Sequence, residues 1–181
     1  MRWERLFDDL EAQLTRDESR GQEAEIADRT RRERASVDLH SRLLGSLGTR
    51  RVSVRVPGRV LVGELVDVGP DWLLLETRPD RPELVALGSV RAVSGLGTGT
   101  HAPSVVAKRF ALGAALRAVS RDRATVEVLD LDGRLTTGTI DVVAADHLEL
   151  AEHASDAPRR AENVVGMQLI PFAALVTVRR L

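Results

Sequence analysis

The chain has 181 residues, of which 43% are hydrophobic and 29% charged, and its formal net charge is −1. Such a composition is typical of a soluble globular protein, and the small net charge provides no general basic field to attract nucleic acid or anionic lipid. The absence of cysteine excludes disulfides, thiolate metal sites and a cysteine nucleophile. Aromatic residues make up only 3%. The core must therefore be aliphatic, which suits small tight barrels better than large aromatic-lined pockets.

The N-terminal segment, residues 1–34, is predicted to be an amphipathic helix followed by a charged stretch. Its apolar positions recur at helical spacing. A helix this short is marginal alone in water, so we expect it to pack on another copy, in a self-association role, or to cover this protein's own barrel. Residues 16–34 are nearly all charged or small, with Ala24, Ile26 and Ala27 as the apolar positions, and form either a solvated helix or a mobile linker. The apolar stripe consists of Trp3, Leu6, Phe7, Leu10 and Leu14.

Targeting and membrane signals are not expected. Residues 1–15 are acidic and amphipathic, unlike a signal peptide with a basic start and an apolar middle. No apolar run approaches the roughly 18 residues that a membrane-spanning helix needs. A cytoplasmic protein without membrane contact is the expectation.

The next region, residues 35–96, is predicted to be a helix followed by five strands. A short helical apolar pattern runs over 37–47, and at Arg51 the apolar period changes to two. Pro57-Gly58 indicates a turn, and Gly63 inside the long second strand indicates a bulge or a sharp bend. The strands are expected over 52–56, 60–68, 72–75, 84–87 and 90–93.

The last region, residues 104–181, repeats this order. Glycines over 95–99 indicate a linker rather than a phosphate-binding loop, because no lysine follows them directly and the Gly-x-Gly-x-x-Gly spacing is absent. An apolar helical face then runs from Val105 to Val119 and includes Phe110, and alternation returns at Ala124.

The two regions match each other residue by residue. An offset of 75 places Gly58 on Gly133 without a gap through the following hairpin, and the first strands match at an offset of 74. The late strands match at an offset of 85, because the loop 152–166 is longer. The same 75-residue offset aligns Gly63 with Gly138, Leu65 with Ile140, Asp71 with Asp146 and Leu73 with Leu148.

The predicted fold class is therefore α+β, mainly β: an N-terminal helix followed by two helix-led five-stranded small barrels. One unit of about 55–70 residues is marginal alone, since small domains bury too little surface. We expect the two units to pack together and to cover edge strands by pairing them.

A helix followed by five strongly bent strands resembles the Sm-like small barrel, one of the SH3-type barrels. The shared features are a glycine in the long second strand and an aspartate before an apolar third strand. The pieces that carry the resemblance are 63–75 and 138–150, with 87–93 and 170–178 as the last two strands.

The resemblance implies ring formation and binding of single-stranded RNA. In the Sm-like pattern an aromatic and an asparagine follow the second strand, and a basic residue lies beside a glycine near the fourth. This chain departs at these positions, which hold Gly69-Pro70, Ala144-Ala145 and Leu87-Gly88. Stacking on aromatic side chains is a main source of single-strand affinity, so RNA binding in that mode is not expected.

No catalytic, metal or cofactor site is predicted. The stretch 130–133 begins like a calcium loop but lacks the later ligands, and an Asp-Gly hairpin turn explains it better. His147 and His153 lack metal-ligand spacing and are expected to be solvated loop and strand residues. No Gly-x-Ser-x-Gly elbow is present, and no small-molecule substrate is expected.

Arginines are the remaining candidates for a binding surface. They form either a nucleic-acid contact face or salt-bridged surface positions. The candidates are Arg50, Arg51, Arg121, Arg123, Arg159 and Arg160. Two functional hypotheses follow. The first is a non-enzymatic interaction or scaffold protein that forms homo-oligomers or binds a protein partner. The second is an RNA- or DNA-binding regulator that uses these arginines.

Overall fold

A computed structural model describes residues 25, 28–32, 35–48, 51–102 and 110–181. The chain divides into two compact units, Met1–Asp38 and Leu39–Leu181. In the described part of the first unit, residues 28–32 are helical. There Asp28 pairs with Arg31 at 2.6 Å and with Arg32 at 3.3 Å, which are the neighbouring positions on a helix. Within the described residues, no helix is long and apolar enough to cross a bilayer.

Several predicted positions lie outside the described residues. They are Arg50 and the apolar stripe Trp3, Leu6, Phe7, Leu10 and Leu14. Their proposed roles remain predictions.

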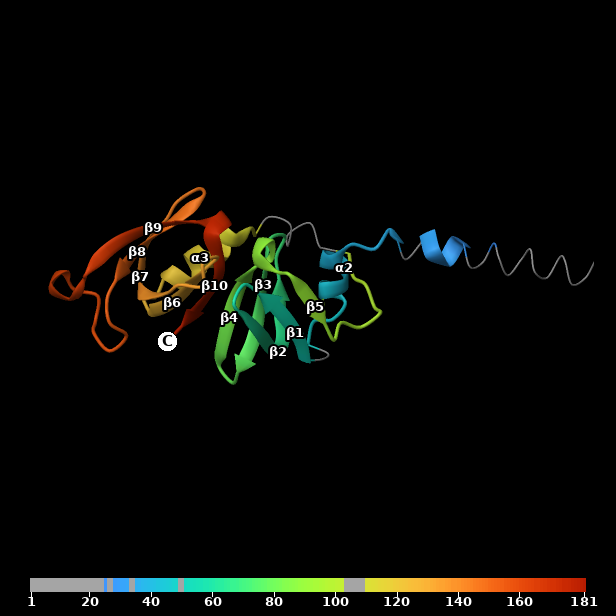
Figure 1. The fold of residues 1–181 in the computed structure, drawn as a ribbon, viewed down its shortest axis with the longest axis horizontal. Coiled ribbons are helices and arrows are strands. Elements are labelled where there is room, and N and C mark those ends of the chain that lie inside the picture. The colour runs from blue at the N-terminus through green and yellow to red at the C-terminus, as the bar shows by residue number, and fades with distance from the viewer. Residues whose placement is uncertain (1–24, 26–27, 33–34, 49–50, 103–109) are drawn as a thin grey trace, which may run out of the picture. The chain divides into compact units, whose positions relative to one another are not determined.

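The first half of the second unit contains the predicted helix and five strands (Figure 1). A 3-10 turn, η1 (Leu87–Ser89), takes the place expected for the end of the fourth strand. The elements are α2 (Leu39–Leu44), β1 (Arg51–Val56), β2 (Arg59–Val68), β3 (Trp72–Arg78), β4 (Arg81–Ala86) and β5 (Ala92–Ser94).

The second half repeats the order of elements. Its helix begins at Leu112, so Phe110, which the sequence placed on a helical face, lies before the helix and is exposed. The 3-10 turns are η3 (Ala161–Asn163) and η4 (Phe172–Ala174). The other elements are α3 (Leu112–Ser120), β6 (Thr125–Asp130), β7 (Leu135–Val143), β8 (His147–Glu152), β9 (Gly166–Pro171) and β10 (Leu175–Arg180).

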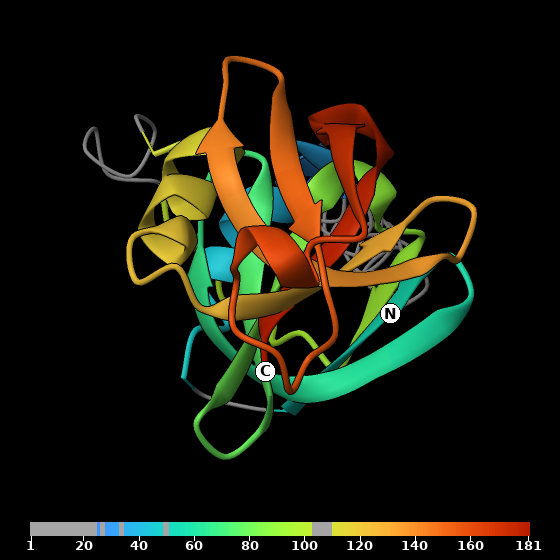
Figure 2. The ribbon, with the colours of Figure 1, turned by 90° about the vertical axis from the view of Figure 1, so that its left-hand side faces the viewer.

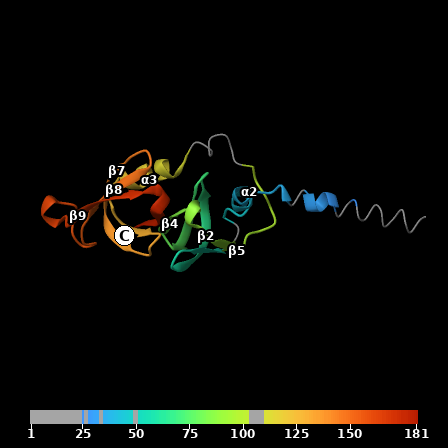
Figure 3. The ribbon, with the colours of Figure 1, turned by 45° about the horizontal axis from the view of Figure 1, so that its top comes forward.

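The ten strands in the described part of the chain form one antiparallel sheet, in the order β5-β1-β2-β3-β4-β10-β6-β7-β8-β9. The prediction of a mainly β fold is confirmed. Closed barrels are not confirmed, because among the described residues β5 and β9 are edges of the sheet, each paired on one side only. The halves are joined by the ladder between β4 and β10, which adjoin in Figures 1 and 3.

Glycines bend the long second strand of each half, as the sequence predicted. A Cβ on Gly63 would collide with the carbonyl oxygen of Glu76, and a Cβ on Gly138 would collide with that of Ala151. Shortly after each glycine the pairing register shifts, in the bulge expected near a bent strand. The curvature of β2 is visible in Figure 2.

Each half surrounds its own aliphatic cluster, with Leu43 of α2 and Leu116 of α3 fully buried. Where β4 meets β10, each cluster also includes side chains from the other half. Leu84 belongs to the cluster of the second half, while Val176 belongs to that of the first. Residues Glu83–Ala86 of β4 and Leu175–Val178 of β10 are buried without alternation. Both strands are therefore covered on both faces.

Candidate association surface

The seam between the two halves is the antiparallel ladder of β4 and β10. Leu84 and Val178, both 3% exposed, face each other and join the second cluster. Val85, on the other face of β4, joins the first cluster. The remaining facing pairs are Val85 with Thr177 and Glu83 with Arg179. One strand thus contributes to two cores, because its alternate side chains point to opposite faces.

A polar cluster crosses this seam. Arg59 of β2 forms an ion pair with Glu83 and donates to the hydroxyl of Thr177 at 2.6 Å. Beside them Arg179 pairs with Glu127 at 2.8 Å. Burial and the nearby charge of Arg179 lower the pKa of Arg59, and Glu127 opposes this effect. Because Glu83 is almost fully buried, removing its partner would leave an uncompensated charge.

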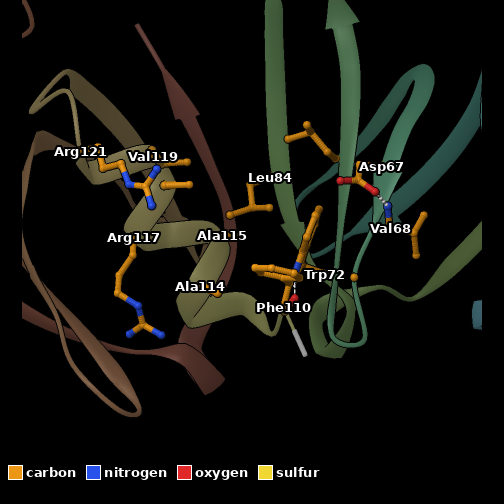
Figure 4. A pocket seen from close by; sticks show the side chains of 13 residues that line it. Asp67, Val68, Trp72, Leu84, Phe110, Ala114, Ala115, Arg117, Val119 and Arg121 are labelled. Atoms are coloured by element: carbon orange, nitrogen blue, oxygen red, sulfur yellow. Dashed lines mark hydrogen bonds between the residues drawn. The ribbon is translucent and has the colours of Figure 1, made fainter. Parts of the chain in front are cut away.

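The helix of the second half is tied to the β2–β3 turn of the first half. The carboxylate of Asp71 accepts a hydrogen bond from the backbone NH of Leu112 at 2.7 Å, at the start of α3. The indole Nε1 of Trp72 donates to the carbonyl of Phe110 at 2.7 Å, a bond drawn in Figure 4. A side-chain carboxylate at this position satisfies an otherwise unpaired helical NH. These two bonds fix where α3 begins relative to the first half.

A groove of about 640 Å³ lies between this turn and α3 (Figure 4). Its floor is apolar and includes Trp72, Leu84 and Val119, while Arg117 and Arg121 lie on its helical side. Among the described residues, neither arginine forms an ion pair with a carboxylate. The groove could accept an apolar group that carries negative charge at one end.

The edge strand β9 pairs with β8 in the same register in which the seam strand β4 pairs with β3. Leu84 of β4 faces Leu74 of β3, and Leu169 of β9 faces Glu149 of β8. The β3 and β8 positions are 75 residues apart, which is the offset of the two long hairpins. Leu169 therefore occupies the place of Leu84.

The other free edge, β5, corresponds to β10 in the same way. Val93 of β5 faces Val54 of β1, and Val178 of β10 faces Val128 of β6. The β1 and β6 positions are 74 residues apart, the offset of the first strands. The two edges of the sheet are therefore unpaired counterparts of the two strands that pair at the seam.

Burial differs sharply between these counterparts. Leu84 is 3% exposed, whereas Leu169 is 64% exposed. Two residues earlier on the same face of β9, Met167 is 48% exposed. An unpaired strand that shows large apolar side chains is a ready template for pairing with another chain. The sequence shows these residues only as alternate members of a strand, so their exposure could not be predicted from it.

The five predicted arginines that the structure describes do not gather in one cluster. Arg51 is exposed at the start of β1, and Arg121 borders the groove. Arg123 and Arg159 both bind Asp141, Arg123 through Oδ1 at 2.9 Å and Arg159 through both carboxylate oxygens. The hydrogen bond and charge of Asp141 raise the pKa of Arg159.

Arg160 lies 4.0 Å from Glu162 across two exposed side chains. Exposed pairs of this kind contribute little stability. Arg123, Arg159 and Arg160 therefore each have a carboxylate neighbour. This is the arrangement expected if these arginines are salt-bridged surface positions and not a nucleic-acid contact face.

One of the two histidines differs from its predicted setting. His153 is 2% exposed, which corrects the expectation of a solvated side chain. Its Nδ1 donates to the carbonyl of Ala154 at 2.8 Å, so its Nε2 is free to accept from the hydroxyl of Thr139 at 2.9 Å. His147 bonds Asp146 through Nδ1 at 2.7 Å and lowers the pKa of that carboxyl. In the described parts of the chain, no three potential metal ligands come together.

Comparison with known proteins gives no relative from which a function could be carried over. No family model, no curated protein and no solved structure matches the chain.

Proposed function

We propose that this protein is a non-enzymatic cytoplasmic scaffold built from two tandem small-barrel units of Sm-like type, and that it acts by self-association. The duplication is supported by two features that recur at one offset of 75. The register shift after Leu65 recurs after Ile140, and the crowded glycine Gly63 recurs as Gly138. Each half also has a helix before its first strand.

The observation that carries the self-association is the free β9 edge. Leu169 and Met167 expose large apolar side chains along a strand whose outer backbone groups have no strand partner among the described residues. Covering them removes apolar surface from water and pairs backbone donors and acceptors. A second copy of this chain offers a matching edge.

Light scattering over a range of protein concentrations tests the proposal. The intact chain of 19.8 kDa should have a mass corresponding to more than one copy. Leu169→Glu should lower that mass toward a single copy, because the new charge would be desolvated in the contact. Leu135→Glu is the matched control, since Leu135 is 54% exposed on β7, inside the sheet. A single-copy mass for the intact chain at all concentrations would refute the proposal.

The alternative function is an RNA- or DNA-binding regulator that uses arginines. Its supporting observation is the pair Arg117 and Arg121 beside the groove, without carboxylate partners among the described residues. Filter binding with RNA and DNA over a salt series tests it, because phosphate contacts weaken steeply with salt. Arg51→Glu and Arg121→Glu should reduce binding. No binding at low salt removes this alternative.

A further inference from the structure

The seam inside the chain is a template for the contact between chains. In this seam the side chains on one face of β4 pack in the cluster of the first half, and those on the other face pack in the cluster of the second half. Its inner face carries Val85 and its outer face carries Leu84. In the matching strand β9, Ile170 corresponds to the inner residue and is 8% exposed, while the outer residue Leu169 is 64% exposed. The strand is thus half packed, and its outer face lacks the neighbouring core that covers β4.

The opposite end of the sheet shows the complementary gap. Val93 on β5 packs at the border of the first cluster and is only partly buried, whereas its counterpart Val178 is 3% exposed. The first residues of the two helices differ in exposure in the same direction. Leu112 of α3 is 5% exposed in the seam, while Leu39, at the matching first position of α2, is 48% exposed. Both ends therefore expose apolar groups whose counterparts are covered inside the chain.

We propose that β9 of one copy pairs antiparallel with β5 of a second copy in the register of the internal seam. The inference rests on the proposed self-association and specifies its partner surface. Leu169 would then face Val93 and extend the first core of the next copy, as Leu84 extends the second core. The other facing pairs are Ile170 with Ala92 and Gln168 with Ser94.

This contact joins two different surfaces and is therefore head-to-tail. Each added copy leaves one free β9 and one free β5, until a ring closes or a filament grows. Arg91 is exposed and occupies the position of the buried Val176, while Gln168 and Ser94 take the places of Glu83 and Arg179 of the internal seam. Because the contact joins separate chains, the association depends on protein concentration and is reversed by dilution.

Engineered cysteines test the register, since the chain has no natural cysteine. In the double variant Val93→Cys with Leu169→Cys, the two thiols face each other across the contact. Directly opposed residues of antiparallel strands have Cα atoms about 4.5–5.5 Å apart, within the range of a disulfide. Mild oxidation should give a ladder of covalent multimers on a non-reducing gel, and reduction should abolish it.

Two controls define the result. Val93→Cys with Met167→Cys keeps the same face but shifts the register by two residues. That places the two Cα atoms about 7–8 Å apart, beyond the usual range of a disulfide, so this variant should cross-link far less. Leu169→Cys alone should stay uncross-linked, because its only thiol has no partner in a head-to-tail contact. Circular dichroism should show that each variant is folded, because Met167 and Leu169 are exposed and Val93 is only partly buried.

The outcomes separate the register from the proposed function. Equal cross-linking of Leu169→Cys alone would mean symmetric pairing of two β9 strands and would overturn the register while self-association stands. Multimers by light scattering without cross-linking of the Val93–Leu169 pair would also overturn the register. If the intact chain is a monomer at all concentrations, the proposed function fails first. In that case a foreign peptide strand becomes the occupant of the edge to test.

Discussion

The matched leucines Leu84 and Leu169 allow the seam to be tested by one substitution made twice. Leu84→Ala and Leu169→Ala remove the same atoms from corresponding strand positions. The first side chain is 3% exposed between two cores and the second is 64% exposed at an edge. We expect very different losses of stability from identical chemistry.

The magnitudes follow from burial. Leu84→Ala should lower the free energy of unfolding by about 2–5 kcal/mol, because it removes buried methyl groups and leaves a cavity. Full burial of a leucine is worth about 1.5–3 kcal/mol, and only about a third of Leu169 is buried, so its loss should be about 0.5–1 kcal/mol. Urea unfolding measures both, at a concentration where light scattering shows single copies.

The same pair of variants also separates folding from assembly. Leu169→Ala should weaken multimer formation at high concentration despite its small effect on the single copy. A loss for Leu84→Ala no larger than that for Leu169→Ala would show that β4 is not covered on both faces. The seam, and the contact between copies inferred from it, would then be wrong.

Two further predictions concern the turn contacts of the halves. Trp72→Phe removes the indole hydrogen bond that holds the segment before α3. It should lower the free energy of unfolding in urea by about 1–2 kcal/mol. An unchanged free energy of unfolding would show that the bond is dispensable. In the matching turn, the hydrogen bond from His147 lowers the pKa of Asp146, so any stability it adds is present above about pH 3.9 and is lost as pH falls through the lowered pKa. His147→Ala should return the Asp146 pKa to its usual range in an NMR titration, and an unchanged value would contradict this cause.

Local features of the fold were predictable from the sequence because they depend on neighbouring residues. Alternating valines around Arg55 indicate a strand wherever that strand ends up in the sheet. Gly63 marks a bend because no other side chain fits beside the next strand. The matching offset of Gly138 extends this conclusion to the second half.

Side-chain partners distant in sequence were not predictable. Arg123 and Arg159 each lie 18 residues from Asp141 along the chain, and only the folded sheet brings both to one carboxylate. His153 looked like a loop residue, yet folding buries it against Thr139. Composition shows which charges exist, but it does not show which of them meet.

The sequence by itself determined the strands and the bends at Gly63 and Gly138, because side-chain period and glycine sterics act within a few residues. Only the tertiary structure decided that β4 pairs with β10, and hence that Leu84 is buried while Leu169 is exposed. Backbone hydrogen bonds carry no residue identity, so any free edge can pair with any other. Which edges meet depends on the whole packed sheet and on the apolar surface that each pairing removes from water.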